Sequence, residues 1–178
     1  QAGEPLPYVL GRWEFFGRDF TLTPAVLIPR PETELLVERA LAWLAGRSGA
    51  LRVADVGAGS GCIAVTLAAE MPGLKLVASD ISWEALQVAR QNAERHGVAR
   101  QVQLLQADLL SPLSGPFDLV CANLPYIPSA LLETLRVARA EPGLALDGGR
   151  DGLYVLRRLL ADLPGKMKPG GLVLLEIE

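Results

Sequence analysis

The segment Asn123-Leu124-Pro125-Tyr126 carries the side chains of this sequence that are best suited to chemistry. It directly follows an apolar run, residues 117–122, which predicts a buried strand. The Asn123 side-chain oxygen and the Leu124 carbonyl could accept both hydrogens of a planar NH₂ group, while the Tyr126 ring packs on its flat face. Because the lone pair of such a nitrogen is delocalised, holding it out of conjugation would activate it. The segment indicates methyl transfer to an amide or aromatic amine nitrogen, although Asn-x-Pro-Tyr also suits a plain turn at a strand end.

A glycine-rich turn, Asp55-Val56-Gly57-Ala58-Gly59-Ser60-Gly61, ends an earlier apolar run. Glycines lack a Cβ atom and let the backbone approach a ligand closely, and Asp55 could hold the turn or meet a cationic group. The dinucleotide-binding fingerprint would place its third glycine one residue later, where this chain has Cys62. The turn predicts a ligand site but argues against a dinucleotide, and a purely structural turn is the alternative.

Two acidic residues end the next two apolar runs. Asp80, in Ser79-Asp80-Ile81-Ser82, stands where a carboxylate can accept both hydroxyls of a ribose. Its alternative role is to cap the helix that follows. Asp108 could accept from the exocyclic amine of an adenine and Leu109 could pack on its ring, whereas a plain loop acid is the alternative.

The pattern of apolar residues predicts strands that alternate with helices. Runs rich in Val, Leu and Ala predict strands at 51–56, 75–79, 102–106, 117–122 and 171–177. Helical spacing predicts helices after the proline-rich segment 28–34, ending near 45, and at 61–69, 82–96 and 152–163. Alternating aromatic and polar residues at 11–20 predict a β-hairpin. We therefore expect an α/β fold: a Rossmann-like, doubly wound, mainly parallel sheet preceded by a short β-hairpin, with ligands beyond the carboxyl ends of the strands.

The composition is that of an ordinary globular protein, with 50% hydrophobic and 21% charged residues among 178. This length predicts one substantial core with at most a small appendage. A net charge of −3 argues against direct nucleic-acid binding. No apolar run reaches the ~20 residues that cross a bilayer, and the first residues do not resemble a signal peptide. We expect a cytoplasmic monomer without membrane contact.

The histidine and the cysteines exclude other kinds of chemistry. His96 is the only histidine and closes a predicted helix, which argues against a Ser-His-Asp triad and against a metal site. Cys62 and Cys121 lie in apolar segments, so we expect two buried free thiols and no disulfide.

Together these motifs resemble the class I S-adenosylmethionine-dependent methyltransferases, and within them the HemK/PrmC family, which methylates N5 of a glutamine in peptide chain release factors. The most specific matches are the segments 26–34, Glu141-Pro142 and 145–153. The resemblance implies S-adenosyl-L-methionine as cofactor, S-adenosyl-L-homocysteine as product and a release factor as protein partner.

The resemblance, combined with the residue types above, defines the expected sites. Catalysis is expected from Asn123, Leu124, Pro125 and Tyr126, which would also hold the substrate amide. Cofactor contacts are expected from Asp55, Gly57, Ala58, Gly59, Ser60, Gly61, Asp80, Ile81, Asp108, Leu109 and Asn123. Substrate contacts are also expected from Arg30 and Glu32, with Glu34 near the same pocket mouth, although prolines and acids at a helix start need no active site.

The sequence departs from the family pattern in three places. The family usually has Asn-Pro-Pro-Tyr, so Leu124 removes one ring and frees Asn123 from the restriction that a following proline imposes. Residues 1–28 are expected to form a hairpin linker that would join a helical N-terminal domain outside this chain. Residues 29–178 are expected to form the catalytic domain without its last strands, so we expect a truncated chain.

Several other functions fit part of the pattern. An adenine-N6 DNA methyltransferase also acts on a conjugated NH₂ group after base flipping, and a ribosomal-protein glutamine methyltransferase has the same acceptor. A nucleotide-binding oxidoreductase would need the later glycine and a site for hydride transfer. A non-catalytic binding module is the remaining alternative.

Overall fold

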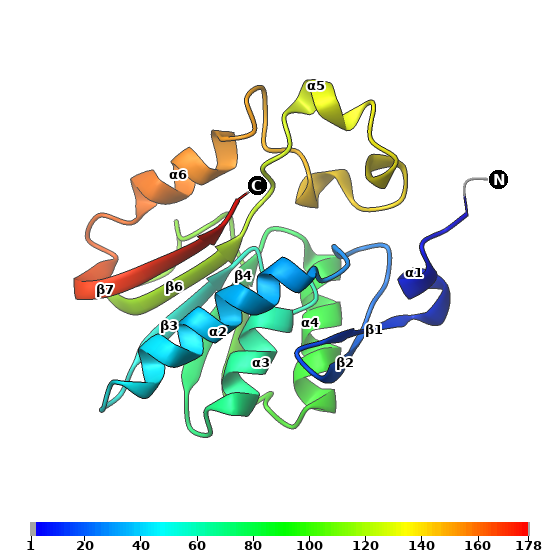
Figure 1. The fold of residues 1–178 in the computed structure, drawn as a ribbon. Coiled ribbons are helices and arrows are strands. Elements are labelled where there is room, and N and C mark those ends of the chain that lie inside the picture. The colour runs from blue at the N-terminus through cyan, green and yellow to red at the C-terminus, as the bar shows by residue number, and fades with distance from the viewer. Residues whose placement is uncertain (1–2, 178) are drawn as a thin grey trace.

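The computed structural model describes residues 3–177; residues 1, 2 and 178, at the outer ends of the two expected domains, lie outside the described part. A five-stranded sheet forms the core in the order β5-β4-β3-β6-β7, and all neighbouring strands are parallel (Figure 1). The strands are β3 (Arg52–Val56), β4 (Lys75–Asp80), β5 (Val102–Gln106), β6 (Phe117–Asn123) and β7 (Met167–Glu176). The predicted doubly wound fold is confirmed. The strand order reverses between β3 and β6, which is where such sheets bind ligands.

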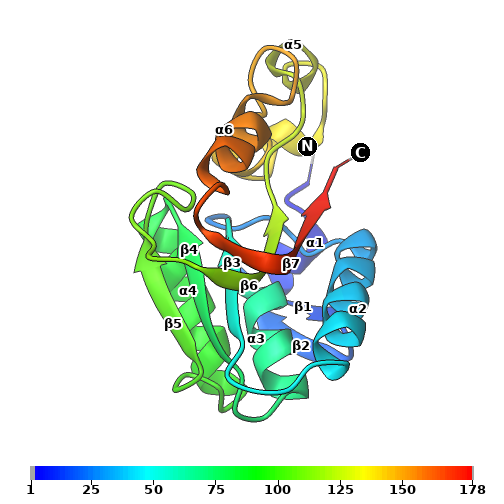
Figure 2. The ribbon, with the colours of Figure 1, turned by 90° about the vertical axis from the view of Figure 1, so that its left-hand side faces the viewer.

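Helices cover both faces of the sheet because successive strand side chains point to opposite sides. On one face, Val53 and Leu119 pack with α2, α3 and α4. On the other face, Ala54 and Val120 pack with α6 and with the segment that follows β5. Both views place α6 across β6 and β7 from α2 and α3 (Figures 1 and 2). The helices are α2 (Pro31–Ala45), α3 (Cys62–Glu70), α4 (Trp83–Arg95) and α6 (Tyr154–Asp162).

The predicted hairpin is present as β1 (Arg12–Phe15) and β2 (Arg18–Thr21). Its aromatic residues Phe15 and Phe20 are buried in the same core as α2 and α3. The short helix α1 (Leu6–Leu10) precedes it and was not predicted, since five residues are too few to show a helical period.

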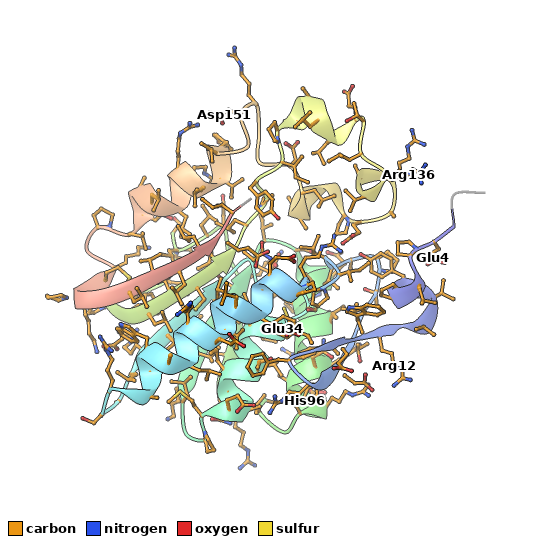
Figure 3. All side chains as sticks on the ribbon, in the orientation of Figure 1. Glu4, Arg12, Glu34, His96, Arg136 and Asp151 are labelled. Atoms are coloured by element: carbon orange, nitrogen blue, oxygen red, sulfur yellow. The ribbon has the colours of Figure 1, made fainter. Side chains whose placement is uncertain are left out.

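Side chains of α4 fix the hairpin on the domain. The amide of Asn92, which is fully buried, accepts from the Thr21 N–H at 2.7 Å and donates to the Thr21 and Ser60 carbonyls at 3.0 and 2.9 Å. At the end of α4, His96 Nε2 lies 2.9 Å from the Asp19 carbonyl (Figure 3). The single histidine therefore has a structural place, and Asn92 links the hairpin to the glycine turn.

Residues 127–153, here called the arm, project beyond the carboxyl ends of β6 and β7 (Figures 1 and 2). The arm contains α5 (Ser129–Leu132) and the 3₁₀ turns η1 (Val137–Arg139) and η2 (Gly143–Ala145). None of these was predicted, because each is a single turn without apolar periodicity. The last strand was predicted to begin too late, because its Pro-Gly-Gly stretch resembles a turn. In the structure β7 begins at Met167, and this stretch lies within the strand beside a register shift against β6.

Candidate functional site

A cavity of about 670 Å³ opens where the carboxyl ends of β3, β4 and β6 meet. Most residues predicted for the cofactor or for catalysis line it: Gly57, Ala58, Gly59, Ser60, Asp80, Ile81, Asp108, Leu109, Asn123, Leu124 and Pro125. Its lining does not include Asp55, Gly61, Tyr126, Arg30 or Glu32. The sheet therefore gathers motifs from four separate parts of the chain around one space.

The glycine turn forms the floor of the cavity. Gly57 has φ +76°, and the N–H groups of Gly57 and of the next residue both donate to the Ser79 carbonyl at 2.9 Å. A Cβ atom at Gly57 would lie 2.9 Å from Leu124 Cδ2. Gly61 plays a different part, since its Cβ would stand 3.1 Å from that of Ala89. This glycine lets α3 pack closely on α4.

Asp80 connects the turn to the start of α4. Its two oxygens accept from the Gly59 and Ser82 N–H groups, each at 2.8 Å. The cap of α4 is Ser82, whose Oγ accepts from the Ala85 N–H at 3.1 Å, so the alternative role of Asp80 as helix cap does not apply. Burial raises the pKa of Asp80, and its backbone hydrogen bonds oppose that shift. A carboxylate has about four acceptor sites, which leaves sites on Asp80 for a ligand.

Asp55 lies beneath the turn and has no exposed surface. Its Oδ2 accepts from the Ala64 N–H at 3.1 Å and so holds the first turn of α3. Desolvation raises the pKa of Asp55 to about 7, the hydrogen bond to Ala64 lowers it, and the charge of Asp80 raises it further. Of the two roles considered from the sequence, the geometry supports holding the turn.

The buried Asp55 carboxyl makes the stability of the fold depend on pH. Because the pKa is raised to about 7 in the folded protein, the folded state binds this proton more tightly than the unfolded chain. Its contribution is present below the unfolded pKa and is lost as pH rises through the folded pKa. We expect the free energy of unfolding to decrease from about pH 4 to about pH 7, by at most about 1.4 kcal/mol per pH unit from this group.

Guanidinium unfolding of wild type and Asp55→Asn at a series of pH values checks this expectation. The variant cannot titrate at this position, so the difference in unfolding free energy between the two proteins isolates Asp55 from other groups. The difference should change steadily over that pH range. A constant difference would assign the pH dependence to other carboxyls.

Asp108 and Leu109 form the wall on the side of β5. Asp108 Oδ2 makes a 2.6 Å ion pair with Arg158 Nη2 of α6, and both side chains remain nearly half exposed. Leu109 is buried with φ +55°, a conformation that residues other than glycine rarely adopt. Asp108 thus joins the cavity rim to α6, and a ligand amine would have to share it with Arg158.

Asn123 ends β6 and faces the cavity beside the last residues of β7. Its Nδ2 donates to Glu176 Oε1 at 2.8 Å and to Thr33 Oγ1 at 3.2 Å. Leu124, which replaces the second proline of the family pattern, is buried against Gly57. The side chain at 124 therefore fixes the segment by packing over the turn rather than by ring stiffness.

The rest of the segment rests on the arm. Tyr126 does not line the main cavity but a small hollow behind Pro125. The Gly148 N–H donates to the Ile127 carbonyl at 2.9 Å, and a Cβ at Gly148 would lie 2.7 Å from the Tyr126 Cα. A Cβ at Gly152, whose φ is +77°, would overlap the Tyr126 carbonyl oxygen. The glycines of the arm thus allow backbone to pack directly on backbone.

Comparison with known proteins adds to this geometry. A family model described as the methyltransferase small domain matches residues 32–140, which is more than half of the chain. The chain belongs to this family. The methyltransferase fold and family expected from the sequence are confirmed.

The relatives of this methyltransferase domain are longer proteins. One named release factor glutamine methyltransferase, from Moorella thermoacetica, is 50% identical over 178 residues, covering 99% of this chain and 62% of the relative. Another of that name, from Geobacter sulfurreducens, is 46% identical over 177 residues, covering 98% and 61%. The chain spans about three fifths of the length of these curated relatives.

A solved structure shares the fold of the methyltransferase domain. It is the 16S rRNA N2 G1207 methyltransferase of T. thermophilus in complex with AdoMet and guanosine. The TM-score is 0.66 at 21% identity, and the match covers 92% of this chain and 40% of that one. This likeness establishes the architecture.

The residues around the start of α2 connect the methyltransferase domain to the arm and to the hairpin. Arg30 Nη2 makes a 2.6 Å ion pair with Glu141 Oε1, while Glu141 Oε2 accepts from the Ile28 N–H at 2.9 Å. Glu32 is exposed, and Glu34 points to the hairpin, where it accepts from the Phe16 N–H at 2.8 Å (Figure 3). Glu141 is itself nearly buried, so it ties the segment 26–31 to the arm.

The sequence did not predict the roof of the cavity. Both sides of that roof are apolar loops, one before α2 and one in the arm: Ala25, Val26, Leu27, Pro29, Pro142, Gly143, Leu144 and Ala145. The available signal was the match of 26–34 and Glu141-Pro142 to the family pattern, which marks both loops without showing that they meet. Thr33 and Glu176 were also missed as partners of Asn123.

The described part of the methyltransferase domain, residues 3–177, offers neither a metal centre nor a membrane span. It contains no group of three or more His, Cys, Asp and Glu side chains that could hold a metal ion. None of its helices is long and apolar enough to span a bilayer. Cys62 and Cys121 are buried free thiols, as expected.

Proposed function

We propose that this domain transfers a methyl group from S-adenosyl-L-methionine to the side-chain amide nitrogen of a glutamine in a peptide chain release factor. One observation carries the proposal: Asn123 and Leu124 line the same cavity as the glycine turn and Asp80. A site for a planar NH₂ group therefore adjoins a site for a nucleoside. The names of relatives that match nearly the whole chain support the glutamine substrate, which would place the reaction in the cytoplasm.

The residues present fit the proposed cofactor. Asp80 has acceptor sites left for the two ribose hydroxyls. Ile81 keeps about half of its side chain exposed at the cavity, and with Leu109 it offers apolar surface to an adenine. The bare backbone of Gly57 and Gly59 leaves room for close approach.

The substrate amide would be held at the end of β6. Asn123 Oδ1 and the Leu124 carbonyl would accept its two N–H hydrogens and turn its lone pair out of conjugation. When bound, the cofactor supplies an electrophilic methyl group, and the C–S electron pair stays on sulfur as the N–C bond forms. The acceptors of the chain stabilise the nitrogen as it becomes positive, after which it releases one proton to water. Positioning accounts for most of the rate.

Asp80→Ala is expected to weaken binding of S-adenosyl-L-homocysteine by about tenfold or more, because two charge-assisted hydrogen bonds to the ribose are lost. Calorimetry measures the affinity, and thermal unfolding of the free variant checks that the turn survives the loss of the Gly59 and Ser82 bonds.

A ligand that lacks the ribose 2′-hydroxyl shows whether Asp80→Ala weakens binding by losing a contact to the ribose or by distorting the glycine turn. The deoxy analogue should bind wild type more weakly than the natural product, and Asp80→Ala should weaken its binding less than that of the natural product, because only the bond to the 3′-hydroxyl is left to lose. Equal additional losses for both ligands would mean that Asp80 shapes the turn without touching the ribose.

Mass spectrometry tests the proposed reaction directly. The full-length protein is incubated with methyl-labelled S-adenosyl-L-methionine and, in separate reactions, with a release factor, a mixture of ribosomal proteins, and duplex DNA. A gain of one labelled methyl on a release factor glutamine is the expected result. Methylation confined to a ribosomal protein or to adenine, or no transfer in any reaction, would overturn the proposal.

A further inference from the structure

Three elements place a polar cluster at the cavity, where Asn123 and Thr33 belong to the lining and Glu176 lies beside Asn123. Asn123 ends β6, Glu176 ends β7 directly opposite it in the parallel register, and Thr33 lies in the first turn of α2. Thr33 is almost completely buried. The Asn123 Nδ2 group donates to both partners, at 2.8 Å to Glu176 Oε1 and 3.2 Å to Thr33 Oγ1. Two long-range contacts thus hold one end of a single amide.

The chemistry of Glu176 decides which way the amide faces. A carboxylate can only accept hydrogen bonds, whereas an amide has a donor end and an acceptor end. When ionised, the Glu176 side chain therefore holds the NH₂ end of Asn123 and turns Oδ1 away from the cluster. A flipped amide would bring two acceptor oxygens together, which costs the desolvation of both without a hydrogen bond.

We propose that Glu176 and Thr33 are positioning residues that fix the amide orientation of Asn123, so that Oδ1 is the atom offered to the N–H of the substrate amide. The inference rests on the proposed function, since it concerns how the site accepts an NH₂ group. Neither residue needs to touch the substrate, because both act through Asn123.

The surroundings of Glu176 are unfavourable for an ionised carboxylate. Its Oε2 atom is buried and has no hydrogen-bond partner within the described residues 3–177. Desolvation raises the pKa of Glu176, the neighbouring Thr33 hydroxyl lowers this pKa, and the charge of Glu32 raises it again. The Asn123 bond and Arg30 lower it. Keeping an ionised carboxylate in this place costs free energy. An uncharged side chain could make a purely structural contact here without that cost.

A pH dependence of the rate follows from this arrangement. As pH falls through the raised pKa, Glu176 gains a proton and can donate to Asn123, so the flipped amide is no longer disfavoured and kcat should decrease. The titratable and charged groups near Glu176 are Glu32 and Arg30 from the start of α2, Cys62 from α3 and Tyr126 after β6. Glu176→Gln should remove this acidic limb and leave a lower, flatter profile.

The test compares single variants of the full-length protein in the release factor assay. Glu176→Gln keeps the shape but can donate, and should lower kcat about tenfold with KM and cofactor affinity changed less than about twofold. Thr33→Val removes one partner and should lower kcat by a smaller factor, whereas Thr33→Ser keeps the hydroxyl and should retain the rate. Thermal unfolding of each variant shows whether a lower rate results from destabilisation of the protein. A wild-type rate and pH profile in Glu176→Gln would overturn the inference.

A double variant separates positioning from a general structural effect. If Glu176 acts through Asn123, adding Glu176→Gln to Asn123→Ala should change the residual rate less than about twofold. A further tenfold loss in the double variant would contradict the inference even if the protein folds. The same data keep the two proposals apart: a normal rate in Asn123→Ala contradicts the proposed function, while a slow Asn123→Ala with a normal Glu176→Gln contradicts only the positioning role.

Discussion

Asn123→Ala in the full-length protein is expected to lower kcat for release factor methylation about 10²–10³-fold, by analogy with the loss of one preorganised oxyanion-hole donor. The contact between Asn123 Oδ1 and the substrate N–H strengthens as the nitrogen leaves conjugation and becomes positive. Its loss therefore raises the transition state more than the bound ground state. Single-turnover methylation of the release factor with saturating cofactor measures the effect.

The affinity for S-adenosyl-L-homocysteine serves as the control for this variant. It should change by less than about threefold, because Asp80 and the glycine turn remain in place and would supply the main cofactor contacts. The variant must also unfold at a temperature close to wild type, since it leaves Glu176 without its 2.8 Å bond. A folded Asn123→Ala protein that methylates at the wild-type rate would refute the amide-holding mechanism.

Gly152→Ala is expected to reduce the free energy of unfolding by about 2–5 kcal/mol, the sum of a left-handed backbone and a steric overlap. Gly152 has φ +77°, and the added Cβ would overlap the Tyr126 carbonyl oxygen and come within 3.2 Å of Pro128 Cδ. Both of these atoms belong to stiff parts of the chain, so the steric overlap can be removed only if the arm moves away from the catalytic segment. Guanidinium unfolding measures the loss.

Gly165 provides a matched control for this substitution. Its φ is +78°, but a Cβ atom there would meet nothing within 4 Å. Gly165→Ala should therefore show only the backbone cost of about 1–2 kcal/mol. Equal destabilisation by the two substitutions would mean that the arm is not packed tightly on Tyr126.

Gly152→Ala should also affect activity, because the Tyr126 carbonyl lies two residues from the Leu124 carbonyl that would accept a substrate hydrogen. The folded fraction of the variant should therefore methylate more slowly than the folded fraction of Gly165→Ala. This comparison links the glycines of the arm to the geometry of the site.

Local sequence patterns were enough to locate four of the five core strands and the position of the cavity. Parallel strands buried on both faces appear as short apolar runs, and such runs located β3, β4, β5 and β6 within a few residues. The turn at Gly57 and the acid Asp80 follow two of these runs, and the carboxyl ends of parallel strands share one edge. The predicted strand ends therefore gathered most of the residues that line the cavity.

Such patterns were insufficient where a residue's role depends on a distant partner. Asp55 and Asp80 look alike in sequence as acids at strand ends, yet one is sealed under the turn and the other faces the cavity. Burial decides between them, because desolvation sets both the pKa and the access of a ligand. Arg30 likewise matched a substrate-binding pattern, but the structure shows it paired with Glu141.

The surroundings of Asn123 depend on the packing of segments that are far apart in the chain. Its partners Thr33 and Glu176 lie 90 and 53 residues away, and neither stands in a motif that indicates an amide partner. They meet because β7 pairs with β6 while α2 covers the same edge. A sequence pattern records periodicity and turn chemistry, whereas the order of strands fixes which side chains become neighbours. The sequence thus placed an amide at the site, and only the packing of β7 and α2 against β6 determined which side chains hold its NH₂ group.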